Sequence, residues 1–139
     1  PMSVSDIMTR APITIAPGAK VREAIALLED LAVRHLPVVD EGRLVGLVSD
    51  RDLREYRIPI MEEIEDPEYA DELLDKPVSE AMHTDVLHVD QGESLKTVVD
   101  LMLEFGVGAV PVVDRTTTQL QGIVSYVDIL RLVRPSLDE

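Results

Sequence analysis

Two short motifs in the chain combine a hydroxyl with a carboxylate at the same spacing. Ser49 is followed three residues later by Asp52, and Ser125 is followed three residues later by Asp128. An ionised carboxylate has two acceptor oxygens, which suits a ligand that presents two adjacent hydroxyl donors, such as a sugar diol. The same Ser-x-x-Asp spacing also forms a capping box at the start of a helix. Taken by themselves, the residues leave both interpretations open.

The chain contains two copies of one sequence unit, and the two motifs occupy equivalent places in them. A displacement of 74 residues aligns Val4-Ser5-Asp6-Ile7-Met8 with Val78-Ser79-Glu80-Ala81-Met82, and Pro37-Val38-Val39-Asp40 with Pro111-Val112-Val113-Asp114. After two extra residues in the second copy, Gly46-Leu47-Val48-Ser49 aligns with Gly122-Ile123-Val124-Ser125. Two copies favour a paired domain over an extended solenoid.

Each copy predicts the element order strand, helix, strand, strand, helix. Apolar residues at helical spacing predict a helix over 21–31 and another over 95–105. Short apolar stretches at 13–15 and 86–89 predict a strand before each helix. Two further strands follow each helix, joined in the first copy by a glycine-containing connection at 41–43. The last helix is expected to start after Ser49 or Ser125.

These elements predict a mixed α/β (α+β) fold with a first repeat over 1–57, a connector over 58–76 and a second repeat over 77–139. A repeat of roughly 60 residues buries too little surface to be robust alone, so we expect the two to pack about a pseudo-twofold axis. The connector is rich in acids, and we expect it to be solvated, with a helical turn near Ala70–Leu74.

Composition excludes several classes of function. With 27 acidic and 13 basic residues the net charge is −14, so the chain should repel nucleic acid. No apolar run approaches the roughly 20 residues of a membrane span, and the N-terminus lacks a secretory pattern, so we expect a cytoplasmic protein without membrane contact. The chain has no cysteine, no Gly-rich phosphate loop and no hydrolase motif. We therefore expect that it is not an enzyme and has no catalytic residues.

The duplicated motifs resemble the CBS domain family, named after cystathionine beta-synthase. Each copy carries V-S-x-x-M, then P-V-V-D, then G-[LI]-V-S-x-x-D, and the resemblance covers nearly the whole chain. No single motif is diagnostic, but their order, spacing and duplication are specific. The resemblance implies two βαββα repeats that form a regulatory, non-catalytic module. Such modules bind AMP, ADP, ATP or S-adenosylmethionine in clefts between the repeats and often form four-domain assemblies, so we expect a homodimer.

The resemblance also implies roles for individual residues. The carboxylates of Asp52 and Asp128 would hold the ribose hydroxyls, and the hydroxyls of Ser49 and Ser125 would assist at ribose or phosphate. The positions implied to flank the adenine or line the clefts are Ile13, Thr14, Val86, Leu87, Pro37 and Pro111. Tyr126, inside the second motif, could stack on a base or simply cover the domain edge.

Basic residues that could reach a phosphate occur in the first copy alone, although cleft walls can mix residues of both copies, so these residues could also serve the second site. They are Arg34, His35 and Arg51, and the matching positions of the second copy are Gly108, Ala109 and Val127. We therefore expect the two sites to differ. The hypothesis is that the Asp52 site takes a phosphorylated ligand, whereas the Asp128 site takes a weakly charged adenosyl group or none.

Several partner predictions complete the interpretation. His83 and His88 are expected to be surface or strand residues, because no neighbouring set supplies three or four metal ligands. No cofactor is required, although Mg²⁺ could accompany a nucleotide. The chain ends in a polar tail, so its unknown client is expected to be another protein. The alternative function is a structural dimerisation module that binds no ligand and acts through a partner protein.

Overall fold

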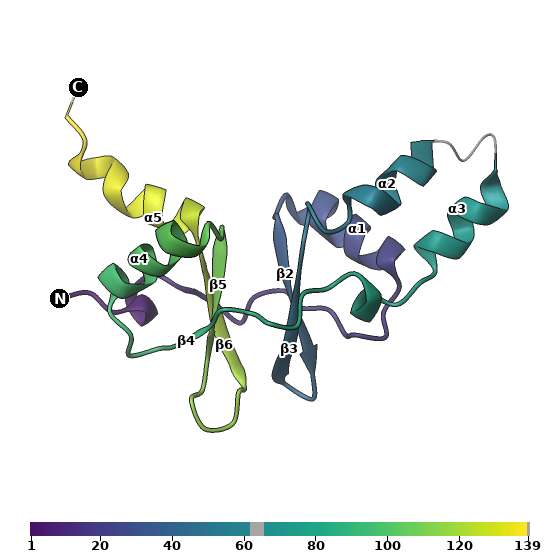
Figure 1. The fold of residues 1–139 in the computed structure, drawn as a ribbon. Helices are drawn as coiled ribbons and strands as arrows, with labels where there is room; N and C mark the ends of the chain where they lie inside the picture. The colour runs from purple at the N-terminus through teal and green to yellow at the C-terminus, as the bar shows by residue number, and fades with distance from the viewer. Residues whose placement is uncertain (62–65, 139) are drawn as a thin grey trace. The chain divides into compact units, whose positions relative to one another are not determined.

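The protein is a mixed α/β chain whose computed structural model describes residues 1–61 and 66–138 (Figure 1). Glu62, Glu63 and Glu65 of the expected acidic connector lie outside the described residues. The helices are α1 (Val21–Leu31), α2 (Arg54–Met61), α3 (Pro67–Leu74), α4 (Leu95–Phe105) and α5 (Tyr126–Val133), with 3-10 turns at Val4–Asp6, Val78–Glu80 and Arg134–Ser136. The strands are β1 (Thr9–Arg10), β2 (His35–Asp40), β3 (Arg43–Ser49), β4 (Val89–Asp90), β5 (Ala109–Val113) and β6 (Leu120–Ser125).

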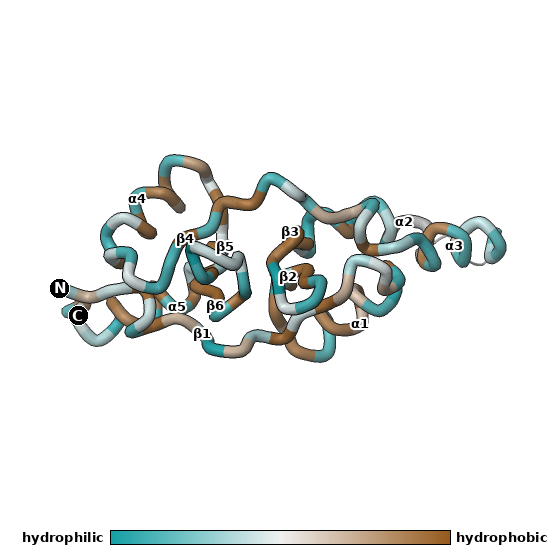
Figure 2. The backbone as a smooth tube through the Cα atoms, turned by 90° about the horizontal axis from the view of Figure 1, so that it is seen from below, coloured by the Kyte–Doolittle hydropathy of each residue, from teal (hydrophilic) through white to brown (hydrophobic). Residues whose placement is uncertain are grey.

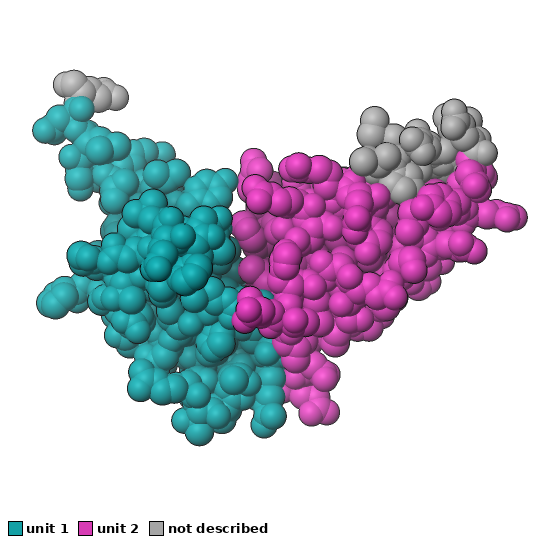
Figure 3. All heavy atoms as spheres, viewed as in Figure 1, with its two compact units in different colours: residues 1–12, 42–44, 86–139 teal, residues 13–41, 45–85 magenta. Residues whose placement is uncertain are grey.

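The chain divides into two compact units that do not coincide with the sequence repeats. Unit 1 comprises residues 1–12, 42–44 and 86–139, and unit 2 comprises residues 13–41 and 45–85 (Figure 3). Each unit therefore joins the body of one repeat to the N-terminal segment of the other. Val4–Asp6 belongs with the second repeat, and Val78–Glu80 belongs with the first.

Unit 1 contains a sheet with strand order β1-β6-β5-β4. The β5 and β6 strands pair in antiparallel fashion, β1 pairs antiparallel with β6, and β4 pairs parallel with β5. In unit 2, β2 and β3 are hydrogen-bonded neighbours, Ile15 bridges Val38 in parallel fashion, and His83 bridges Leu47 in antiparallel fashion. The two units thus share one pairing order, in which His83 occupies the place that Thr9 has against Ile123.

Gly46 in β3 and Gly122 in β6 make room for the N-terminal segment of the other repeat, which we call the exchanged segment. A Cβ on Gly46 would lie 2.5 Å from Met82 Sδ and 2.8 Å from the His83 carbonyl oxygen. A Cβ on Gly122 would lie 2.8 Å from both Met8 Sδ and the Thr9 carbonyl oxygen. Separations below 3 Å are severe overlaps, so only glycine permits this backbone approach. This explains the glycine of the G-[LI]-V-S motif.

The helices expected from apolar periodicity are confirmed over their full predicted ranges. In unit 2, α1 buries Val21, Ala24, Ile25 and Leu28 in a core with residues of β2 and β3. In unit 1, α4 buries Val98 and Met102 against Val110, Val112 and Val124 of the sheet. Figure 2 shows this pattern as hydrophobic and hydrophilic stretches that alternate along α4. Burial of one helix face on a sheet therefore organises each unit.

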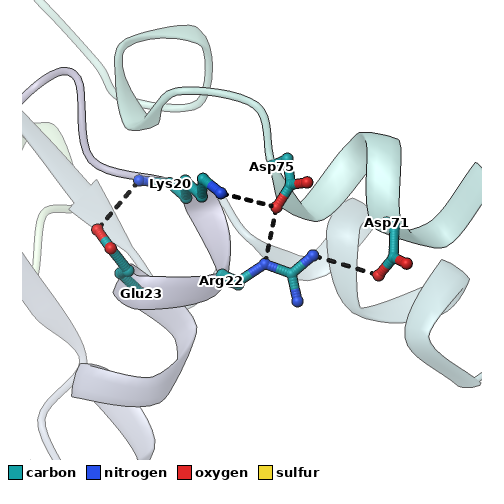
Figure 4. A network of polar contacts seen from close by, with 5 residues as sticks. All are labelled: Lys20, Arg22, Glu23, Asp71 and Asp75. Atoms are coloured by element: carbon teal, nitrogen blue, oxygen red, sulfur yellow. Dashed lines mark hydrogen bonds and ion pairs between the residues drawn. The ribbon is translucent and has the colours of Figure 1, made fainter.

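The second half of the acidic connector is a docked helix, longer than the single turn expected. Ala70 and Leu74 of α3 are buried, and Leu74 joins the core of unit 2. Asp71 of α3 and Asp75, its C-cap, remain exposed, but they meet Arg22 of α1, and Lys20 just before α1 also contacts Asp75 (Figure 4). Arg22 Nε lies 2.9 Å from Asp75 Oδ1, and Arg22 Nη2 lies 3.3 Å from Asp71 Oδ1. These bonds raise the pKa of Arg22, and the bond from Arg22 lowers the pKa of Asp75.

The short strands predicted before α1 and α4 are mostly wrong. Ile15 forms only an isolated bridge, and Ile13 and Thr14 have no regular structure. Only Val89 of the second predicted strand is in a strand, since β4 runs over Val89–Asp90. Only the last residue of each apolar run, Ile15 or Val89, is buried, so the runs did not set the strand limits. No helix among residues 1–61 and 66–138 has the length and hydropathy that a membrane span requires.

Candidate functional site

The first motif lies in unit 2 at the end of β3, where the chain turns toward α2. Asp52 Oδ2 accepts hydrogen bonds from the Ser49 backbone N–H at 2.8 Å and from the Ser49 hydroxyl at 2.9 Å. The Asp52 backbone N–H donates to Ser49 Oγ at 3.2 Å. These are the contacts of a capping box, but residues 50–53 form a turn and α2 begins only at Arg54, so they close this turn and do not cap the helix that was expected to start after Ser49. Because both donors use Oδ2, the orientation of the carboxylate is set and Oδ1 points elsewhere.

The second motif repeats this geometry in unit 1, at the junction of β6 and α5. Asp128 Oδ2 accepts from the Ser125 backbone N–H at 2.9 Å and from the Ser125 hydroxyl at 3.3 Å. Ser125 Oγ accepts from the Asp128 backbone N–H at 3.4 Å, which completes the capping box of α5. The β5–β6 register places Ser125 beside Ala109, and the Tyr126 N–H donates to the Gly108 carbonyl.

His83 distinguishes the two carboxylates, and the sequence did not indicate its role. Its Nε2 contacts Asp52 Oδ1, although the imidazole is 70% exposed and the Asp52 side chain only 10%. Asp128 Oδ1 makes no comparable contact within the described part of the chain. The repeat alignment pairs His83 with Thr9, but only the exchange of N-terminal segments brings His83 to Asp52. The sequence correctly predicted that His83 is exposed, but it did not predict the contact of His83 with Asp52.

The basic residues predicted for a phosphate lie near Asp52. The Arg34 carbonyl accepts from the Asp50 N–H at 2.9 Å, which holds the start of β2 beside the end of β3. Burial lowers the pKa of His35, and the nearby charge of Asp52 opposes this effect only partly. The side chains of Arg34 and Arg51 are exposed, and both residues share unit 2 with Asp52.

Asp50, which sits inside the first motif, shares the guanidinium of Arg57 with Glu29. Arg57 Nη2 lies 3.1 Å from Asp50 Oδ1, and Arg57 Nη1 lies 3.5 Å from Glu29 Oε1. The Asp50 carboxylate therefore opposes an incoming anion less than its place in the motif suggests. The equivalent position in the second motif is the aromatic side chain of Tyr126, which is 39% exposed.

The remaining predicted positions divide cleanly between the two units. Ile13, Thr14 and Pro37 share unit 2 with Asp52, whereas Val86, Leu87 and Pro111 share unit 1 with Asp128. The Ile15 N–H donates to the Pro37 carbonyl at 3.1 Å, so the segment that contains Ile13 and Thr14 runs beside β2. Both prolines are buried, Ile13 and Thr14 are exposed, and Val86 and Leu87 are half-buried. Among residues 1–61 and 66–138, no group of three or more His, Asp or Glu side chains is placed to hold a metal ion.

Comparison with known proteins agrees with the duplicated motifs. The family model of the CBS domain matches residues 4–59 and again residues 78–135. Among solved structures, the chain is similar to the CBS domain pair of protein MJ0100 in complex with 5′-methylthioadenosine and S-adenosyl-L-methionine. The identity is 29%, each chain is covered to 98%, and the TM-score is 0.77. It is also similar to CBSX2 in complex with AMP, with 29% identity, 98% coverage of each chain and a TM-score of 0.80.

A curated relative shows that this unit also occurs inside longer proteins. Protein MJ1225 of Methanocaldococcus jannaschii is 29% identical over 133 residues, which is 92% of this chain and 46% of the relative. The chain thus spans about half the length of that relative.

Proposed function

The chain belongs to the CBS domain family, and we propose that it is a regulatory module that binds an adenosyl ligand through the carboxylates of Asp52 and Asp128. One observation supports this proposal above the others. Each carboxylate is anchored through Oδ2 by its own serine, while its second oxygen faces away from that cap. A carboxylate acceptor fixed in this way suits the hydroxyl donors of a ribose.

The ligands of the structural relatives share one chemical group. AMP, 5′-methylthioadenosine and S-adenosyl-L-methionine all contain adenosine, and they differ in what the 5′ carbon carries. A ribose contact through a carboxylate would be common to all three. The choice among them would depend on the groups that meet the 5′ substituent.

We infer that the two sites select different 5′ substituents. Arg34 and Arg51 lie in unit 2 with Asp52, and the matching positions in unit 1 are Gly108 and Val127. A phosphate gains charge-assisted hydrogen bonds from arginine, whereas a methylthio group gains nothing there. The Asp52 site would therefore prefer AMP or another adenine nucleotide, and the Asp128 site would prefer a weakly charged adenosyl compound.

Isothermal titration of metabolite-stripped protein tests this function. AMP, ADP, ATP with and without Mg²⁺, S-adenosylmethionine and 5′-methylthioadenosine are titrated into the unsubstituted protein and into Asp52→Asn and Asp128→Asn. We expect Asp52→Asn to lose AMP binding and Asp128→Asn to lose 5′-methylthioadenosine binding. Asp100→Asn is the matched control, because Asp100 is an exposed acid of α4 paired only with Lys96. No heat with any purine compound would refute the proposal.

The alternative is a structural module whose motifs serve only the local backbone, and the capping box of α5 and the turn closed by Ser49 and Asp52 are compatible with it. Thermal unfolding separates the two functions. A ligand at a hundred times its dissociation constant should stabilise a binding module by about 2.7 kcal/mol. A structural module should unfold at the same temperature with and without every adenosyl compound.

We further propose that the module works as a homodimer and passes its signal to a client protein. Exposed apolar side chains on α4 and α5 of unit 1 support such an interface, namely Leu103, Phe105 and Leu130 at 77%, 59% and 57% exposure. Ligand binding can shift such an assembly only through different affinities for its two states. Sedimentation of the unsubstituted protein and of Leu130→Ser tests the dimer, since a monomer at all concentrations would contradict it.

A further inference from the structure

His83 is held against the first motif from a rigid position. Its backbone N–H donates to the Leu47 carbonyl at 2.9 Å, and its carbonyl accepts from the Leu47 N–H at 3.0 Å. Gly46, next to Leu47, lacks the side chain that would push this segment away. The backbone of His83 is thus tied to β3, and its imidazole reaches Asp52 from there.

The hydrogen-bond capacity of the two carboxylates differs for this reason. A carboxylate offers about four lone-pair sites. Asp52 uses two for Ser49 at Oδ2, and the imidazole of His83 lies against Oδ1 through Nε2. Asp128 uses two for Ser125 at Oδ2, and no other donor to it occurs among the residues that the structure describes. Oδ1 of Asp128 is open to both hydroxyls of a diol, whereas at Asp52 the contact with the His83 imidazole narrows the approach to that oxygen.

We propose that His83 is a specificity-determining residue that reduces the preference of the Asp52 site for a vicinal diol. This inference rests on the proposed binding of ribose by Asp52. With His83 on Oδ1, the second ribose hydroxyl finds no acceptor on this carboxylate. A nucleotide that has one of the two hydroxyls therefore binds nearly as well as one that has both. The Asp128 site keeps full discrimination between ribose and deoxyribose.

A pair of ligands that differ only in one hydroxyl provides the measurement. AMP and 2′-deoxy-AMP carry the same phosphate and base, so the ratio of their dissociation constants isolates the ribose contact. The measurement is made in the Asp128→Asn background, where only the Asp52 site remains. With His83 present, we expect 2′-deoxy-AMP to bind only a few-fold more weakly than AMP. With His83→Thr, the freed lone pair should raise the ratio by about tenfold, chiefly through tighter AMP binding.

Two matched variants test the geometry itself. His83→Gln keeps a donor near the place of Nε2, so its ratio should stay close to that of the parent. Thr9→His places the same side chain at the equivalent position, because Thr9 pairs with Ile123 as His83 pairs with Leu47. In the Asp52→Asn background, we expect Thr9→His to lower the ratio between adenosine and 2′-deoxyadenosine at the Asp128 site. Threonine already occupies the position in unit 1, so His83→Thr should fold normally, and a thermal melt checks this.

The outcomes separate this inference from the proposed function. If AMP binds but His83→Thr leaves the ratio unchanged, His83 does not compete for the diol and the inference is overturned. If His83→Thr weakens both nucleotides equally, His83 is a phosphate contact, which also overturns it. Failure of the unsubstituted protein to bind any adenosyl compound would instead overturn the proposed function, and the inference with it.

Discussion

Replacing Gly46 with alanine tests whether the exchanged segment is held by close backbone contact. The new Cβ would lie 2.5 Å from Met82 Sδ and 2.8 Å from the His83 carbonyl oxygen. The methionine side chain can move, but the carbonyl is fixed by its hydrogen bond with the Leu47 N–H at 3.0 Å. Overpacking of this kind costs about 1–3 kcal/mol, and the loss of one net hydrogen bond costs about 1 kcal/mol. We therefore expect Gly46→Ala to destabilise the protein by about 2–4 kcal/mol.

Urea unfolding monitored by circular dichroism measures this loss, with Gly18→Ala as the control. A Cβ on Gly18 would meet no described atom within 4 Å, so that substitution should be neutral or slightly stabilising. Adding Met82→Ala to Gly46→Ala should recover only part of the stability, because the carbonyl overlap remains. If Gly46→Ala unfolds at the same urea concentration as Gly18→Ala, the close approach of this segment to β3 is wrong.

Three further predictions follow from individual contacts. Ser125→Ala removes the cap of α5 and should cost about 1 kcal/mol, with faster amide exchange in the first turn of that helix; unchanged exchange would contradict the cap. Because burial lowers the pKa of His35 in the folded state, the unfolded chain takes up a proton first as the pH falls below about 6.5. The free energy of unfolding should therefore fall between about pH 7 and pH 5, and a loss just as steep in His35→Gln would exclude this cause. Leu74→Ala should cost about 2–5 kcal/mol, whereas Tyr69→Ala, at an exposed position of the same helix, should change stability by less than about 0.5 kcal/mol; equal effects would mean that α3 is not docked.

The local elements were predictable because their signals lie within a few residues of one another. Apolar residues at helical spacing set α1 and α4 to their observed limits, since burying one face of a helix demands that period. The Ser-x-x-Asp spacing likewise predicted the cap of α5, whereas in the first motif the same contacts close a turn before α2. The connector was harder, because Ala70 and Leu74 are too few to distinguish a docked helix from a solvated turn.

The duplication, the order of elements and the two capped carboxylates are therefore properties that the sequence by itself determined. Tertiary structure alone decided that the N-terminal segment of each repeat packs on the body of the other, and so placed His83 on Asp52. The spacing of apolar residues indicates which face of a helix or strand is buried, but it does not indicate which segment of the chain covers that face. That partner depends on a steric fit at Gly46 and Gly122, where the absence of a side chain admits a distant stretch of backbone.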